Sequence, residues 1–553
     1  MHRALLSALL CALALSCASV RPAAPPAALD LKIVHGRIVD GTGAPWFRGD
    51  VGVRGDRIVA VGDLGATPAL RTIDAGGRMV APGFIDLLGQ SQGSVLIDPS
   101  LEGKIRQGVT TEVTGEGWSP GPVSEEQAAE RQAAGERAWR TLGDYFAVLE
   151  RQGIATNFAF LVGATNPRAI VLGMGDRDPN EEEMVRMEGL VDAAMRDGAI
   201  GISTSLIYVP ATFAETEELV RLAAVARRHG GVYFTHIRNE GDDIMPALEE
   251  AFEIGRRTGI PVNIWHLKTS GPANHGRMPS VIAKIEEARR EGVDVAANMY
   301  PYIASSTGLT MLVPSWALEG GYAAFQRRLR DPELRAKIAA EVERSGLPSR
   351  ATGADGVLVT RIPNRELEHL ERKNLEQIAG EMGVPPIEAL LRLYEQSPSA
   401  PGAVYFTMNE EDVQFALRQP FIAIGADSGS VPASRRSQGA HPRAYGTFPR
   451  VVGHYARDLG LFSIEEAVRK MTSLAAARAQ LRDRGVIREG MKADIIVFDP
   501  ETIRDRSTFE DPHQYSEGVE AVIVNGVAVL EGGEMTGARP GRVLRGPGWE
   551  GEK

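Results

Sequence analysis

The sequence predicts an α/β protein built on a (β/α)8 (TIM) barrel, with a small β-sandwich domain formed from both chain ends and a helical insertion before the eighth strand. Eight short apolar segments alternate with amphipathic segments in the middle of the chain, and repeated strand–helix units form a parallel sheet covered by helices. Similar apolar runs, interrupted by Gly and Asp, occur near both ends. The 553 residues also suffice for one large domain and a smaller one.

The strands expected in the barrel are short apolar runs. They cover residues 83–88, 109–114, 157–162, 199–204, 232–236, 262–266, 293–298 and 421–426. Amphipathic segments such as 217–229 and 279–292 predict the covering helices. We expect the barrel over residues 81–485, with the insertion at about 320–400, because such barrels accommodate long insertions. A doubly wound open sheet is the alternative, although no G-x-G-x-x-G follows the first strand.

The two ends of the chain have the composition of β-hairpins. Runs such as DVGVRGDRIVAVGDL near the start and GVEAVIVNGVAVLEGGEM near the end combine apolar residues with turn residues. We expect residues 28–80 and 486–545 to form one β-sandwich. Two separate hairpin units are the alternative.

Residues 1–27 are expected to be a signal peptide followed by a Pro/Ala-rich linker. A basic start precedes the apolar run 4–15, which is too short to span a bilayer. Both cysteines of the chain, Cys11 and Cys17, lie in this segment, so the mature protein would contain no disulfide. The residues before Cys17 resemble a bacterial lipoprotein box. We therefore expect an exported protein that is periplasmic or anchored at the cell envelope by lipid on Cys17, or alternatively secreted.

The charge balance argues against nucleic acid as the main partner. The chain has 61 Lys and Arg against 72 Asp and Glu, a net charge of −11. Nucleic-acid-binding proteins present a basic surface to the phosphates. A small-molecule substrate is expected instead. The oligomeric state has no signal in the sequence.

Polar residues occur where several of the predicted barrel strands end. Glu116 follows the second strand, His236 ends the fifth, His266 ends the sixth, with Lys268 two residues on, and Asp427 follows the eighth. In such barrels the active site lies at this end of the strands. Two imidazoles and two carboxylates at one mouth are suitable for zinc, which needs about three protein ligands and an open position for water. The ion would activate the water and polarise a carbonyl, and a carboxylate would transfer the proton.

A set of motifs resembles the N-acyl-D-amino-acid deacylases of the amidohydrolase superfamily. The strings VAPGFID, GVTTEVTGEGWSPGP, STSLIYVP, FTHIRNEGD, WHLKTSGPANHGR, NMYPYIASST, IGADSG, HPRAYGTFPR and GVIREGMKADIIVFDP occur in the same order as in that family. They extend over about residues 30 to 530, nearly the whole mature chain. HPRAYGTFPR is the most specific of them.

The resemblance implies roles for individual residues. His236 and His266 match zinc-binding histidines, and Asp427 matches the aspartate that activates the water and protonates the leaving nitrogen. Arg443 and Lys268 match residues that hold the substrate carboxylate, a role to which the fork of an arginine is suited. Polar pocket residues are matched by Tyr208, Tyr300 and Ser306.

The chain departs from the family pattern at two places. Leu88 and Gln90 occupy the positions of the usual His-x-His pair, and leucine cannot bind a metal. The deacylases carry a ligand cysteine in a Gly-Asn-Cys-Gly element, where this chain has Glu116 between two glycines. We therefore expect one zinc ion per chain, with Glu116, His236 and His266 as ligands. Manganese or iron would also suit this ligand set.

These observations predict metal-dependent hydrolysis of the amide bond of an N-acyl amino acid, of D configuration by the resemblance, with zinc-bound hydroxide as nucleophile and Asp427 as general acid and base. Hydrolysis of a cyclic amide or an unusual dipeptide is an alternative. A metal-free binding protein on a former amidohydrolase barrel is another, which a Glu116 turned away from the histidines would favour. Deamination is a weaker alternative, because one fold hosts several chemistries.

Overall fold

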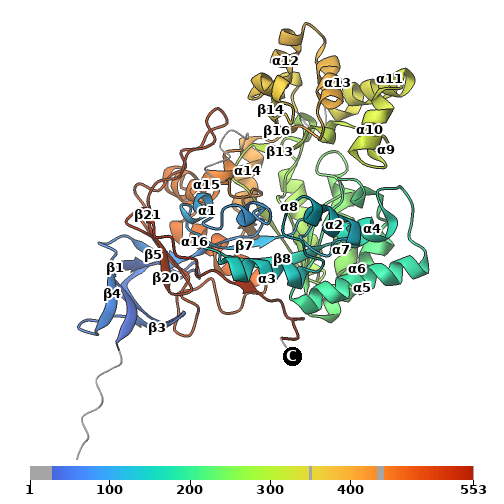
Figure 1. Cartoon of the computed structure of the whole chain (residues 1–553). Helices are drawn as coiled ribbons and strands as arrows, with labels where there is room; N and C mark the ends of the chain where they lie inside the picture. Colours follow the sequence, from blue (N-terminus) through green and yellow to red (C-terminus); the bar gives the residue numbers. More distant parts are fainter. Residues whose placement is uncertain (1–27, 348–350, 432–440, 552–553) are drawn as a thin grey trace, which may run out of the picture.

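The computed structural model describes residues 28–347, 351–431 and 441–551. A central barrel carries a small β-domain on one side and a separate insertion that stands above the barrel (Figure 1). The segment 1–27, including Cys11 and Cys17, lies outside the described residues. In the part of the chain that is described, no helix has the length and apolar character needed to cross a membrane.

Eight parallel strands form the barrel, as predicted. They are β6 (Phe84–Asp86), β7 (Val109–Thr114), β8 (Asn157–Gly163), β9 (Gly201–Ser205), β10 (Val232–His236), β11 (Val262–Ile264), β12 (Val295–Met299) and β17 (Ile422–Ile424), paired in chain order. The first and last strands close the barrel, since Leu87 N–H donates to the Ile424 carbonyl at 3.3 Å and Asp427 N–H to that of Leu88 at 2.8 Å. The strands are continuously buried, as expected of a sheet with both faces covered.

Helices pack round the barrel and bury one face each. The main ones are α3 (Leu142–Gln152), α5 (Glu181–Asp197), α6 (Thr216–Arg228), α7 (Ile244–Thr258), α8 (Met278–Arg290), α14 (Glu410–Leu417) and α16 (Ile464–Met471). Five further helices accompany them: α1 (Glu102–Ile105), α2 (Glu125–Ala133), α4 (Thr165–Leu172), α15 (Arg443–Arg450) and α17 (Ser473–Arg478). Capping boxes start several helices; at α5 Asn180 accepts from the Glu183 N–H and Glu183 from the Asn180 N–H.

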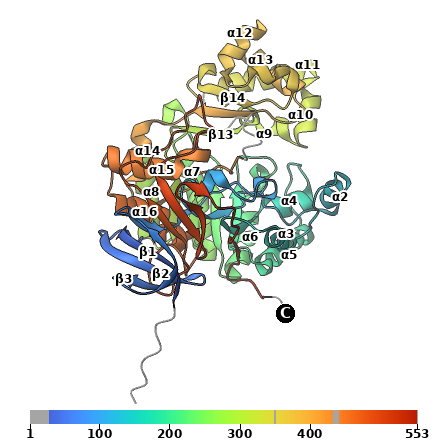
Figure 2. The same ribbon diagram turned by 60° about the vertical axis from the view of Figure 1, so that its left-hand side comes forward.

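The two chain ends form one β-domain. It consists of β1 (Leu29–Ile38), β2 (Phe47–Arg54), β3 (Arg57–Gly62), β4 (Ala69–Asp74), β5 (Met79–Pro82), β18 (Ile495–Phe498), β19 (Val519–Val524), β20 (Val527–Glu531) and β21 (Glu534–Met535). These strands belong to one continuous sheet, joined where β5 pairs antiparallel with β18. Both ends contribute to its core, for example Ile33 and Ile523. Figure 2 shows the strands of the two ends side by side.

The insertion before the eighth strand contains a sheet that the sequence did not reveal. Its strands are β13 (Ala304–Gly308), β14 (Val357–Arg361), β15 (Lys373–Asn374) and β16 (Gly402–Phe406), and its helices are α9 (Ser315–Leu318), α10 (Tyr322–Leu329), α11 (Pro332–Glu341), α12 (Leu375–Met382) and α13 (Pro386–Gln396). The prediction of a helical insertion at 320–400 was therefore incomplete. The insertion has a hydrophobic core of its own, which includes Leu312 and Phe325. Its strands are short and pair across long separations, so local pattern does not reveal them.

The C-terminal residues also differ from the prediction, which assigned 486–545 to the β-domain. After β21 the chain returns to the barrel, where β22 (Val543–Leu544) pairs in parallel with β8. Val543 lies beside Phe158 in that pairing, and Gly546 N–H donates to the Gly198 carbonyl at 2.8 Å. This tail therefore belongs to the barrel.

Candidate metal centre and substrate cavity

A cavity of about 540 Å³ opens where the barrel strands end. It is lined by all nine residues singled out in the sequence: Glu116, Tyr208, His236, His266, Lys268, Tyr300, Ser306, Asp427 and Arg443. They come from the ends of six barrel strands or the loops that follow them, from the insertion strand β13 and from α15. The barrel topology thus brings together side chains separated by more than 300 positions in the chain.

Glu116, His236 and His266 form the one group of three or more acidic, histidine or cysteine side chains, among the described residues, that is placed to hold a metal ion. Oε1 of Glu116 lies 3.0 Å from Nδ1 of His236 and 3.1 Å from Nε2 of His266. The side chains are only 8%, 5% and 3% exposed, respectively. One carboxylate oxygen and two imidazole nitrogens that converge in this way are a suitable ligand set for zinc.

The backbone around these residues is locally constrained. Glu116 lies between Gly115 and Gly117, both with positive φ, and a Cβ on either glycine would come within 2.6 Å of Leu161 O or of the Ser205 side chain. Only glycine fits such positions without strain. His266 also has a positive φ of 35°, which is unusual for a residue other than glycine. Such conformations are enriched at functional sites.

Gln90 contacts the second oxygen of Glu116. Its Nε2 donates to Oε2 of Glu116 at 2.5 Å, so Oε1 alone faces the two histidines. Burial opposes the ionisation of Glu116, but the hydrogen bonds from His236 and His266 outweigh it and hold the pKa of this carboxyl below its ordinary value. Leu88, the other substituted family position, is fully buried and offers no ligand atom. A charged carboxylate with one oxygen held by an amide is thus presented to the histidines.

Glu240, which the sequence analysis did not single out, lies behind the histidines. Its Oε1 is 3.0 Å from Nδ1 of His266 and accepts a hydrogen bond from Nζ of Lys268 at 2.5 Å, and its Oε2 is 3.5 Å from Nε2 of His236. Burial opposes ionisation of Glu240, yet Lys268 and the two histidines together lower the pKa of its carboxyl well below the ordinary value. A carboxylate that accepts from the outer nitrogen of a ligand histidine fixes its tautomer and orientation.

Asp427 and Arg443 form an ion pair in the lining of the cavity. Oδ2 of Asp427 lies 2.8 Å from a terminal nitrogen of Arg443. Burial raises the pKa of the Asp427 carboxyl, and the charge of Arg443 opposes the rise only in part. A carboxyl whose pKa is raised toward neutrality is better suited to accept and return a proton.

The remaining predicted residues form the walls of the cavity. The guanidinium of Arg443 lies 4.6 Å from the ring centre of Tyr300, and its other terminal nitrogen donates to the Ser306 backbone carbonyl at 3.2 Å. The hydroxyl of Tyr208 is 2.8 Å from that of Thr307. The Tyr300 hydroxyl is buried without a hydrogen-bond partner among the described residues, so it is available to a ligand.

The sequence contained a signal for Glu240 that was not used. It lies four residues after His236 in FTHIRNEGD, one of the strings that carry the family resemblance. The loop after β10 brings Oε1 of Glu240 within 3.0 Å of Nδ1 of His266, a contact that the local sequence pattern does not reveal. Gln90 was recognised only as a lost ligand, and its contact with Glu116 depends on two strands meeting in the barrel.

Comparisons with known proteins agree with this fold. A profile described as amidohydrolase family matches residues 437–530. D-aminoacylase of Alcaligenes xylosoxydans xylosoxydans is 38% identical over 520 residues, covering 93% of this chain and 97% of that protein. The chain therefore belongs to the amidohydrolase family.

Solved structures show which members of the family this chain resembles. N-acyl-D-glutamate deacylase of Bordetella bronchiseptica, complexed with zinc and a phosphonate mimic of the tetrahedral intermediate, superposes with a TM-score of 0.79 at 35% identity. D-aminoacylase, described by one-metal activation and second-metal attenuation, gives 0.78 at 39%. Each comparison covers 94% of this chain and all of the other. Within the family, the chain is thus similar to the N-acyl-D-amino-acid deacylases, as its motifs indicated.

Proposed function

We propose that this protein hydrolyses the amide bond of N-acyl-D-amino acids with one zinc ion per chain. The observation that carries the proposal is the convergence of Glu116, His236 and His266 in a cavity that also holds Asp427 and Arg443. The ligand atoms of the three metal-site residues lie within 4.8 Å of one another. A similar protein is a D-aminoacylase described by one-metal activation, which supports the choice of a single ion.

The residues present fit a metal ion. Three ligands leave a coordination position for water or substrate, as catalytic zinc sites require. Glu240 is placed to hold the proton of Nδ1 on His266, which leaves the lone pair of Nε2 directed at the centre. When bound, the ion would supply Lewis-acid activation of a water molecule and of the scissile carbonyl.

The other side chains would orient the substrate and move the proton. Arg443 is placed to bind the substrate carboxylate through its planar fork, and Lys268 lies on the same wall. Asp427 would accept the proton of the attacking water on Oδ1 or Oδ2 and return it to the departing nitrogen. Because Arg443 now contacts Asp427, a substrate carboxylate that took over Arg443 would leave Asp427 free to act as base.

The geometry counts against a metal-free binding protein. A Glu116 turned away from His236 and His266 would have favoured that alternative, whereas its Oε1 lies within 3.1 Å of both. A buried carboxylate paired with two imidazoles is costly to maintain unless it has a function. No comparable observation favours a cyclic amide or a dipeptide as substrate.

The test is metal analysis combined with substrate profiling. Purified protein should contain about one zinc per chain and hydrolyse N-acetyl-D-amino acids faster than their L enantiomers. His266→Ala should lose metal and activity together, while His369→Ala, which removes an exposed histidine of the insertion, should lose neither. Zinc-supplemented wild type that hydrolyses no member of a broad N-acyl panel would overturn the proposal.

A further inference from the structure

Asp427 lies beyond the strand pairing that closes the barrel. The two strands that meet at this closure are short, since β6 ends at Asp86 and β17 ends at Ile424. Asp427 follows the end of β17 by three residues, and its φ of 48° is uncommon for a residue other than glycine. A residue keeps such a conformation where the surrounding structure holds it. The position of Asp427 therefore depends on contacts other than regular strand pairing.

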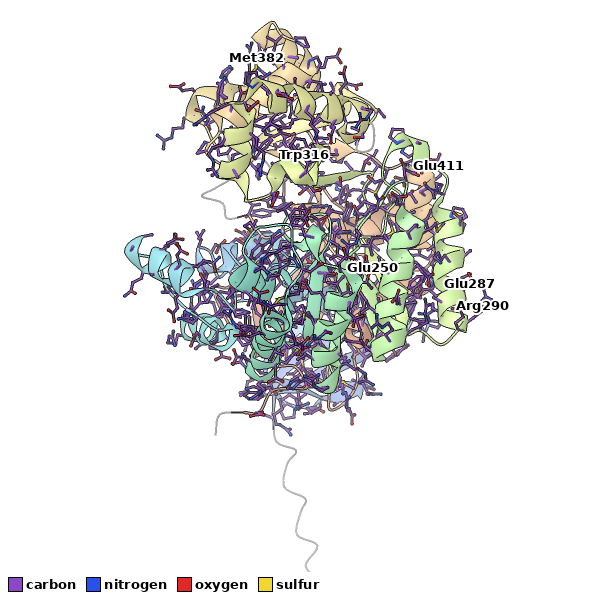
Figure 3. The ribbon with its side chains drawn as sticks, turned by 90° about the vertical axis from the view of Figure 1, so that its right-hand side faces the viewer. Glu250, Glu287, Arg290, Trp316, Met382 and Glu411 are labelled. Atoms are coloured by element: carbon purple, nitrogen blue, oxygen red, sulfur yellow. The ribbon has the colours of Figure 1, made fainter. Side chains whose placement is uncertain are left out.

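A buried ion pair lies next to this segment. Nζ of Lys104, on α1, is 2.7 Å from Oδ2 of Asp86, and neither side chain has any exposed surface. Figure 3 shows Glu287 and Arg290 of α8 on the outer surface of the barrel, where charged side chains are ordinarily found. Replacing both members of a buried pair by apolar side chains is often neutral for stability, although removing one partner is costly. Stability alone therefore does not account for the Asp86–Lys104 pair.

The Asp86–Lys104 pair holds the backbone on both sides of Asp427. Oδ1 of Asp86 accepts a hydrogen bond from the Ala426 N–H at 2.8 Å. Nζ of Lys104 donates to the Ser428 carbonyl at 2.7 Å. The residue directly before Asp427 and the residue directly after it are thus bound to the same two side chains.

The same pair also fixes the segment that faces Asp427 across the closure. The Leu88 N–H donates to Oδ1 of Asp86 at 3.0 Å, and the Leu88 carbonyl accepts the Asp427 N–H at 2.8 Å. The Ser428 carbonyl accepts a second hydrogen bond, from the Gln90 N–H at 3.2 Å. A displacement of Asp427 would therefore break hydrogen bonds that the pair organises.

We propose that Asp86 and Lys104 are positioning residues for proton transfer, which act by holding Asp427 in its left-handed conformation at the cavity. This inference rests on the proposed function, in which Asp427 carries the proton. A proton carrier must lie within hydrogen-bonding reach of the groups that it serves, and a misplacement of about 1 Å can lower a rate about 100-fold. Neither Asp86 nor Lys104 is among the described residues that line the cavity, so their effect on turnover passes through Asp427.

Two single variants test the proposal in zinc-loaded protein, with kcat expressed per folded molecule. Lys104→Met removes the charge and the donor to the Ser428 carbonyl. Its kcat should fall about 100-fold, with unchanged KM and zinc content, because the substrate and metal contacts remain. Asp86→Asn is the milder variant, since its amide oxygen can still accept both N–H groups while the ion pair is lost. Its kcat should fall about tenfold, and it carries the test if Lys104→Met does not fold.

Lys470→Met is the matched control. Lys470 is also a fully buried lysine, and its Nζ donates to the Ile422 carbonyl at 3.2 Å, at the opposite end of β17 from Asp427. This variant should lose stability, yet its kcat per folded molecule should equal that of wild type. A similar fall of kcat in Lys470→Met and Lys104→Met would assign the effect to a general loss of structure and overturn the proposal.

A double variant tests whether the effect passes through Asp427. Adding Lys104→Met to Asp427→Asn should lower kcat by less than about threefold, because the carboxylate that the pair positions is already absent. A further fall of about 100-fold would show that Lys104 acts through another group, which contradicts the proposal.

Amide hydrogen exchange gives a readout that does not require turnover. The peptide that contains Ala426 to Ser428 should exchange about tenfold faster in Lys104→Met than in wild type, and at the wild-type rate in Lys470→Met. Unchanged exchange and kcat in Lys104→Met, in a protein that does hydrolyse N-acyl amino acids, overturn the positioning role alone. Zinc-loaded wild type without activity on any N-acyl amino acid overturns the proposed function, and faster exchange in Lys104→Met would still show that the pair holds this segment.

Discussion

Glu112 carries a pH dependence of stability that a single substitution should remove. It lies on β7, fully buried beneath the barrel mouth, and a Cβ at Gly89 would come within 2.2 Å of its Oε2. Burial raises the pKa of its carboxyl to about 7, and the Lys104 ammonium opposes the rise only in part, while Asp86 adds to it. In the unfolded chain this carboxyl would titrate near its ordinary pKa of 4.5.

The sign and size of the effect follow from this difference. Between pH 4.5 and 7 the unfolded chain releases the Glu112 proton while the folded protein keeps it, so the free energy of unfolding falls as pH rises. The interval of 2.5 units, at about 1.4 kcal/mol each, gives a loss of about 3.5 kcal/mol that is complete above pH 7. Glu112→Gln has nearly the same volume and no ionisation, so it should lack this loss.

The assay is urea unfolding of wild type and Glu112→Gln between pH 5 and 8. The difference in unfolding free energy between the two proteins should grow by about 3 kcal/mol in favour of the variant as pH rises. Glu126→Gln, which alters an exposed glutamate of α2, should follow wild type throughout. Parallel profiles for wild type and Glu112→Gln across this range would refute the reasoning.

Three further substitutions test other contacts. Asp427→Asn should lower kcat by about 100- to 10,000-fold with unchanged zinc content, and an active variant would remove Asp427 from the proton transfer. Glu240→Gln should weaken zinc binding about 10- to 100-fold in a competition titration with a chelator, because the carboxylate no longer fixes His266; unchanged affinity would contradict that role. Lys104→Met should lower stability by about 3–5 kcal/mol in urea unfolding, since it removes the buried ion-pair partner of Asp86, whereas a neutral effect would contradict a stabilising role for this pair.

The barrel was predictable because its strands carry a local signal. Strands buried on both faces read as continuous apolar runs, and the segments 109–114 and 232–236 match β7 and β10 at both ends. The insertion sheet has no such signal. β13 reads Ala-Ser-Ser-Thr-Gly, and β15 has only two residues. Their strand character comes from pairing with β16 and β14, which tertiary structure decides.

The polar residues in and below the barrel mouth also fall into two groups, those that the sequence could place and those that it could not. Residues at strand ends, such as His236 and His266, could be placed because the fold directs strand ends to one mouth. Glu240 and Glu112 could not. Glu240 lies in the loop after β10, where its contact with His266 depends on the tertiary fold, and Glu112 is a buried acid in a strand whose pattern predicts an apolar residue. The role of an acid in such a position can be recognised only when the structure shows which groups surround it.

The two departures from the family pattern, at the His-x-His positions and at Glu116, are connected in the structure by the contact between Gln90 and Glu116. A histidine at position 90 would offer a metal a lone pair, whereas the amide of Gln90 donates a hydrogen bond to Glu116 and cannot bind a metal through the same nitrogen. That bond occupies Oε2 of Glu116 and leaves Oε1 for His236 and His266. Gln90 therefore orients the carboxylate of Glu116, which completes the set formed with His236 and His266. Leu88, at the other substituted position, is buried and offers no ligand atom, which supports the proposed single ion.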